Sequence, residues 1–134
     1  MKIFKLGQID EKVAAKILPL YIQAGWTNEY CESEIAKLKD SFLNSYCVFC
    51  AEQDGEIVGV FRALSDGVSD AYLLDLYVEN SHRNCGIATG LCRNILQYLK
   101  SKNIEWITCI STREGAFVYK KFGSEMKGHI PYKF

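Results

Sequence analysis

The chain has 134 residues, with 16 basic and 16 acidic side chains that leave no net charge at neutral pH. This length suits one domain, expected to span residues 1–134, whose core needs neither disulfides nor a structural metal. The balanced charge argues against nucleic acid as a partner, and without a membrane-length apolar run or a signal-peptide core we expect a cytoplasmic protein with no membrane partner.

The first third of the chain predicts a short strand followed by two amphipathic helices. Lys2–Leu6 has strand composition, and Asp10 is a suitable N-cap for a first helix that Pro19 is expected to kink or divide. The apolar positions of this helix share one face: Val13, Ile17 and Tyr21. After a break at Gly25–Thr27, four apolar residues at helical spacing predict the second helix: Cys31, Ile35, Leu38 and Phe42.

The middle of the chain predicts an antiparallel meander and a long helix. Three β-rich stretches, CVFCA, IVGVFRAL and AYLLDLYV, are separated by Asp54-Gly55 and by the polar segment Ser65–Asp70. Within that segment we interpret Asp66 and Asp70 as turn formers rather than as acids of a site. The helix is predicted over Ile87–Lys100, where apolar residues recur on one face: Ile87, Leu91, Ile95 and Leu99.

Towards the C-terminus, Ile104–Ile110 has strand composition, and Glu114–Phe122 fits a short helix closed by Gly123. The last ten residues predict an edge strand near Pro131. Because the passage Tyr72–Ile110 can form a right-handed βαβ unit, the fold class is α/β (α+β). We expect a mixed, mostly antiparallel sheet with a central parallel pair, flanked by helices.

Six cysteines are spread along the chain: Cys31, Cys47, Cys50, Cys85, Cys92 and Cys109. Without a secretory signal they are expected to be reduced and mostly buried. Cys47 and Cys50 lie in a predicted strand, where residues three apart point to opposite faces. We therefore interpret this CxxC as core rather than as a metal site.

The segment ENSHRNCGIATG joins the third meander strand to the long helix. Such a junction presents unpaired backbone N–H groups at the positive end of a helix dipole, which is a suitable place for an anion. Gly86 lets the backbone approach a diphosphate closely, and Arg83 adds a positive charge. An ordinary tight connection explains the same residues.

This segment resembles motif A of the GCN5-related N-acetyltransferases, in which Arg/Gln-x-x-Gly-x-Gly/Ala follows a strand and opens a long helix. Here the motif reads Arg83-Asn84-Cys85-Gly86-Ile87-Ala88. Three other stretches resemble the same superfamily, RALSDGVSDAYLLD, DLYVENSHR and REGAFVYKKFG, so that the resemblance covers about residues 48–123. Two positions depart from it: Asn84 stands where glycine is frequent, and Ser124 replaces an aromatic residue.

The resemblance implies an acyl-CoA N-acyltransferase-like fold and an acetyl-CoA-dependent N-acetyltransferase that needs no metal. In such an enzyme a primary amine, carried by a small molecule, a peptide or a protein, attacks the acetyl group of acetyl-CoA directly. The implied contacts with the pantetheine arm are backbone groups of Leu76, Tyr77 and Val78. The implied contacts with the pyrophosphate are amides of the turn: Arg83, Asn84, Cys85, Gly86, Ile87, Ala88 and Thr89.

Two residues are candidates for proton transfer. Tyr119 matches the family position whose hydroxyl serves as general acid and is our first choice of catalytic residue, with a ring that merely packs on the sheet as the alternative. Asp75 is the ionisable residue of its apolar strand and is our first choice of base, with a salt-bridged structural acid as the alternative. Trp26, Tyr30 and Tyr72 are candidates for the acceptor pocket, and core packing explains them equally well.

A different class of function stays open: a non-catalytic acetyl-CoA sensor that binds a protein partner. A dinucleotide binder is disfavoured because Gly7–Asp10, after the first strand, lacks the required Gly-rich loop. His82 and His129 have no ligand-like neighbours in the sequence, so we expect neither a metal site nor a histidine base, and His82 is expected on a solvated turn. A homodimer is one assembly that the sequence allows.

Overall fold

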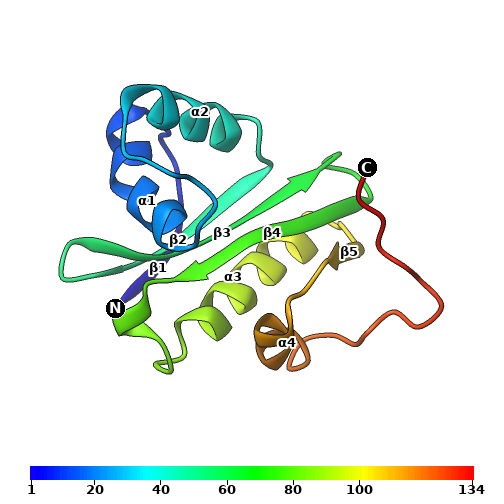
Figure 1. The fold of residues 1–134 in the computed structure, drawn as a ribbon. Helices are drawn as coiled ribbons and strands as arrows, with labels where there is room; N and C mark the ends of the chain where they lie inside the picture. The colour runs from blue at the N-terminus through cyan, green and yellow to red at the C-terminus, as the bar shows by residue number, and fades with distance from the viewer.

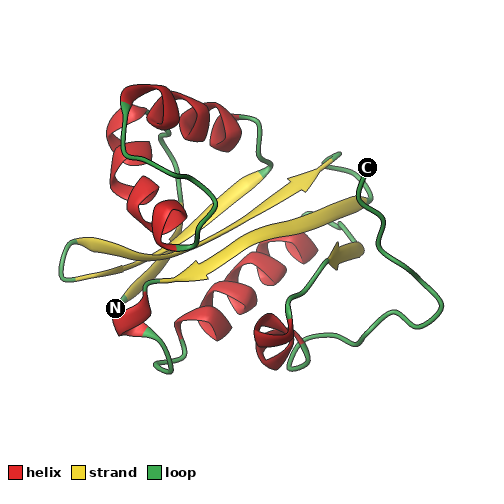
Figure 2. Cartoon of the chain, viewed as in Figure 1, coloured by secondary structure: helices red, strands yellow, loops and turns green.

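The structure is a computed structural model that describes residues 1–134. A mixed five-stranded sheet is covered on both faces by helices, α1 and α2 on one face and α3 and α4 on the other (Figures 1 and 2). The elements in chain order are β1 (Lys2–Lys5), α1 (Glu11–Gln23), α2 (Glu32–Leu43), β2 (Cys47–Gln53), β3 (Glu56–Ser65), β4 (Asp70–Val78), a 3₁₀ turn (Asn80–His82), α3 (Ile87–Ser101), β5 (Trp106–Cys109) and α4 (Arg113–Tyr119).

The strands lie side by side in chain order, from β1 to β5. The first four pair antiparallel, and β4 pairs parallel to β5 through the crossover helix α3. The mixed sheet with one parallel pair confirms the predicted fold class, but the pair lies at an edge rather than at the centre. The edge strand predicted near Pro131 does not form, so no strand lies beyond β5.

Two apolar cores lie on opposite faces of the sheet because strand side chains alternate. Cys47 belongs to the core under α3, and Cys50 belongs to the core under α1 and α2, which confirms the predicted split of the CxxC pair. Burial raises the pKa of each of these two thiols to about 12. Both residues are therefore core thiols.

Local signals place most element ends correctly. The Asp10 carboxylate accepts the Val13 N–H over 2.9 Å and caps α1 as predicted. Pro19 does not divide this helix, which continues to Gln23. An internal proline costs about 3 kcal/mol or more, and burial of the neighbouring Leu18 and Leu20 against the sheet opposes that cost.

Two predictions about turns have different outcomes. The Asp66 carboxylate accepts the backbone N–H groups of Val68, Ser69 and Asp70, which confirms its role as a turn former and holds its pKa well below the usual range. Gly123 does not cap α4, because that helix ends at Tyr119 with Lys120 as its cap. None of the helices is both long enough and apolar enough to span a membrane.

Candidate functional site

The strands β4 and β5 separate halfway along β4. They pair only where Asp70–Leu73 lies beside Trp106–Cys109, after which β5 ends and the chain leads into α4. The outer backbone edge of Leu74–Val78 therefore has no strand partner and faces a groove of about 940 Å³. The groove is lined by residues from the end of β4, the start of α3 and α4, and Figure 1 shows how these three elements are arranged.

A β-bulge interrupts β4 at Asp75. Arg62 of β3 pairs with Leu74, and Val60 of β3 pairs with Tyr77. Between these two pairs β3 has one residue whereas β4 has two, so β4 carries the extra residue of the bulge. Asp75 has a positive φ of 62°, which is uncommon for a residue other than glycine. The bulge turns this side chain towards α1, and Asp75 also lines the groove.

The Asp75 carboxylate makes two hydrogen bonds through the same oxygen. Oδ2 accepts from Arg62 Nε over 2.6 Å and from the Tyr21 hydroxyl over 2.9 Å. The side chains of Arg62 and Asp75 are 15% and 21% exposed, so this is a largely buried ion pair. The salt-bridged interpretation of Asp75 is thus realised, while its second oxygen, Oδ1, has no protein partner.

The start of α3 presents free backbone N–H groups to the groove. Gly86 is the N-cap in a left-handed conformation, with φ of 80°, and no side chain caps this end. No protein acceptor meets the amides of residues 84–89, and no acidic residue lies in the first turn. A Cβ at Gly86 would meet no atom within 4 Å, so an anion can approach this backbone.

Asn84 also adopts a left-handed conformation, with φ of 60°. Glycine is frequent at this position of the motif because it takes positive φ without strain, and asparagine is among the residues that tolerate it best. The departure noted in the sequence therefore leaves the backbone of the turn intact.

The first turn of α3 packs closely on the sheet at Gly59. A Cβ at this position would lie 3.0 Å from Leu91 Cδ1 and 3.1 Å from Ile87 Cγ2. A side chain at this position would push Leu91 and Ile87 back by a few tenths of an ångström, so glycine favours the close approach of α3 to β3. The sequence does not point to Gly59, because this glycine lies within a predicted strand and has no turn residues beside it.

Two cations, Arg83 and Lys121, lie at the α3 end of the groove. The Arg83 guanidinium stands 5.1 Å from the centre of the Tyr77 ring, and its Nε donates to the Val78 carbonyl oxygen over 3.2 Å. Lys121 Nζ donates to the Thr89 hydroxyl over 3.2 Å. Sequence reasoning missed Lys121, because Lys120 and Lys121 are adjacent in the last predicted helix, Glu114–Phe122, and the sequence does not indicate which of them faces the groove.

Tyr119 lines the groove with a hydroxyl that makes no hydrogen bond within the protein. Its ring packs on the core under α3, 6.2 Å from the Phe61 ring, so the packing interpretation also holds. Burial raises the pKa of this hydroxyl, with smaller contributions from Cys109 and Cys92. The hydroxyl therefore keeps its proton at neutral pH.

The three aromatic candidates for the acceptor pocket lie in different places. Trp26 lines the groove and contacts the Tyr77 ring edge-on at 5.8 Å. Tyr30 is exposed and Tyr72 is half-buried, and neither lines the groove. Of the three residues, Trp26 is the one that this cavity supports as an acceptor contact.

His82 lies on the 3₁₀ turn, as expected, and its ring also lines the groove. Its Nδ1 is 2.7 Å from Glu79 Oε2, which also accepts from the Ser81 backbone N–H and hydroxyl. These hydrogen bonds, those from Ser81 first, lower the pKa of Glu79 to about 2. The carboxylate thus keeps its charge and holds the turn together.

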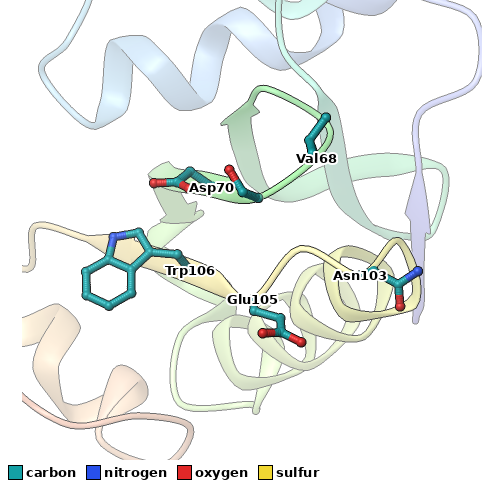
Figure 3. Close-up of a pocket in the computed structure, with 6 residues that line it drawn as sticks. Val68, Asp70, Asn103, Glu105 and Trp106 are labelled. Atoms are coloured by element: carbon teal, nitrogen blue, oxygen red, sulfur yellow. The ribbon is translucent and has the colours of Figure 1, made fainter.

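A second pocket, of about 550 Å³, lies at the opposite ends of the same strands. Figure 3 shows Val68 from the β3–β4 turn and Asp70 from the start of β4 on one side, and Asn103, Glu105 and Trp106 on the other. It contains neither a helix start nor a cation. This pocket is therefore separate from the groove at the α3 N-terminus.

Comparison with known proteins agrees with this geometry. Residues 16–123 match the model of the acetyltransferase (GNAT) family. The chain therefore belongs to this family. Rat N-acetyltransferase family 8 member 2 is 27% identical over 107 residues, which cover 73% of this chain and 47% of that protein. The chain thus spans about half the length of this relative.

Solved structures show the same fold. A GNAT-family acetyltransferase from Streptococcus pneumoniae is 24% identical and superposes with a TM-score of 0.77, covering 98% of this chain and 97% of that one. A predicted acetyltransferase from Clostridium acetobutylicum, solved with acetyl-CoA, is 20% identical with a TM-score of 0.74 and coverages of 98% and 95%. Both cover nearly the whole chain.

Proposed function

We propose that this protein is an N-acetyltransferase that uses acetyl-CoA to acetylate a primary amine by direct attack. The observation that carries the proposal is one groove lined jointly by the unpaired edge of β4, the uncapped N-terminus of α3 and the free hydroxyl of Tyr119. Membership of the acetyltransferase family supports the same reaction class. When bound, acetyl-CoA supplies the acetyl thioester.

The residues of the groove fit this cosubstrate by their chemistry. The free amides of residues 84–89, together with Arg83 and Lys121, suit a pyrophosphate, because backbone donors at a helix start and fixed cations bind anions. The unpaired backbone edge at Leu76, Tyr77 and Val78 suits the amide groups of a pantetheine arm, which would add to the sheet like a strand.

Proton transfer is assigned to two side chains of the groove. Tyr119 Oη carries the proton that a departing thiolate requires, because a tyrosine hydroxyl is protonated at neutral pH. Asp75 Oδ1, which has no protein partner, accepts a proton from the acceptor's ammonium group, directly or through water, and the neutral amine then attacks the thioester. Trp26 lies on the acceptor side, where its ring suits an apolar or cationic amine.

A thiol-release assay with acetyl-CoA and a panel of amines tests this function. We expect free coenzyme A to appear at a rate that depends on the amine. Binding of acetyl-CoA by calorimetry, with no thiol released for any amine in the panel, would instead support a non-catalytic sensor that binds a protein partner. No binding at all would contradict both functions.

A further inference from the structure

Gln23, the last residue of α1, reaches across the end of the sheet to the junction between β4 and α3. Its Oε1 accepts from the Asn80 backbone N–H over 2.9 Å and from the Tyr77 hydroxyl over 3.1 Å. Its Nε2 donates to Glu79 Oε1 over 3.3 Å. One side chain therefore joins the end of α1 to three positions more than 50 residues further along the chain.

Tyr77, one of these partners, stands between the two sides of the groove. Its ring contacts Trp26 edge-on, with 5.8 Å between the ring centres. The same ring lies 5.1 Å from the Arg83 guanidinium. A single ring, fixed through its hydroxyl by Gln23, thus touches both the aromatic residue assigned to the acceptor and a cation assigned to the pyrophosphate.

The residues next to Gln23 and its partners in the chain also connect the acceptor side of the groove with its pyrophosphate side. Glu79 and Asn80 lie a few residues before the turn at residues 83–89, and Ala24 and Trp26, which come shortly after Gln23, line the groove. Because Gln23 holds Glu79 and Asn80, a shift of the turn that reaches these two residues would change the hydrogen bonds to Gln23 and move the loop that carries Trp26. Coupling between two sites needs such a continuous set of contacts with more than one arrangement.

We propose that Gln23 is a positioning residue that couples the pyrophosphate turn to Trp26, so that cofactor binding sets the acceptor side of the groove. This inference rests on the proposed function, since it takes coenzyme A as the ligand of the turn. Gln23 itself does not line the groove. Its contribution is to hold Tyr77 and the turn in one arrangement with the end of α1.

Tryptophan fluorescence tests the coupling without an amine. The chain has two tryptophans, and Trp106 lies at the start of β5, so W106F leaves Trp26 as the reporter. We expect coenzyme A to change the emission of Trp26 saturably, with the dissociation constant measured by calorimetry. In W106F/Q23M this change in emission should be lost, while coenzyme A still binds.

The exposed Gln97 on α3 forms no side-chain hydrogen bond, and W106F/Q97M is the matched control, with an unchanged amplitude. W106F/Y77F removes the hydroxyl partner of Gln23 and should abolish the change in emission in the same way, which keeps the test valid if Q23M fails to fold. Two results would overturn the inference but leave the proposed function standing, provided that calorimetry shows coenzyme A bound. One is a full change in Trp26 emission in both W106F/Q23M and W106F/Y77F, and the other is no change in emission in W106F itself. If calorimetry detects no binding, the proposed function fails together with the coupling.

Discussion

Arg62 Nε donates to Asp75 Oδ2 over 2.6 Å, and this ion pair joins β3 to the bulge of β4 beside the groove. The geometry gives Asp75 a structural partner and leaves Oδ1 free for chemistry. A catalytic role and a structural role of Asp75 can be separated by changing each member of the ion pair, because only Asp75 could accept a proton.

D75N keeps the shape of the side chain and removes its charge. We expect kcat to fall at least about 100-fold, the range of general-base catalysis, and stability to fall by about 1–3 kcal/mol because Arg62 loses its ion partner. R62M breaks the same pair but keeps the carboxylate, so its kcat should fall much less. Equal kcat values for D75N and R62M, measured by thiol release, would assign Asp75 to structure alone.

Y119F removes a hydroxyl that no protein atom requires as a hydrogen-bond partner. We expect kcat to fall by about 100-fold through loss of the general acid, with the dissociation constant of acetyl-CoA nearly unchanged in calorimetry. Y98F is the matched control, because Tyr98 packs on Phe49 on the other side of α3 and does not line the groove. Unchanged turnover in Y119F would end the assignment of Tyr119.

K121M and K120M form a matched pair of lysine variants. Lys121 Nζ lies beside Thr89 in the groove, whereas Lys120 Nζ stands over the Phe117 ring and Lys120 does not line the groove. We expect K121M to weaken binding of coenzyme A about tenfold, since a charge-assisted contact worth roughly 1.4 kcal/mol is lost. K120M should bind as the wild type does. Titration calorimetry measures both, and equal affinities would remove Lys121 from the phosphate site.

G59A tests the close packing that positions the α3 N-terminus. The added methyl group would press on Leu91 and Ile87, and we expect the free energy of unfolding to fall by about 1–3 kcal/mol. G7A is the control, because a Cβ at Gly7 meets no atom within 4 Å. Urea unfolding compares the two variants. Equal stability of G59A and G7A would mean that the helix can shift without cost.

E79Q tests the pH dependence of the β4–α3 turn. The pKa of Glu79 is lowered from 4.5 to about 2 in the folded protein, mainly by hydrogen bonds from Ser81. A lowered pKa stabilises the fold above the unfolded value, and this contribution disappears as pH falls from about 4.5 towards 2. Wild type should therefore be more stable than E79Q at neutral pH, and urea unfolding should show the difference narrowing in acid. A difference independent of pH would contradict this origin.

Much of the fold could be predicted from local patterns. The apolar spacing of Ile87–Lys100 predicted α3 nearly to its last residue, and the alternation of β2 predicted that Cys47 and Cys50 lie on opposite faces. The resemblance to the acetyltransferases also identified the turn at Gly86. These features depend on residues close together in the chain, where period and turn chemistry determine the backbone.

The detailed site was decided by contacts between distant segments. Asp75 meets Tyr21 across 54 positions of the chain, and Lys121 meets Thr89 across 32. The sequence alone left the role of Asp75 open and gave no reason to choose Lys121 over Lys120. The position of the parallel pair at the sheet edge likewise depends on whether the last residues find a partner strand. Such outcomes are settled by packing across the whole molecule, which local propensity does not encode.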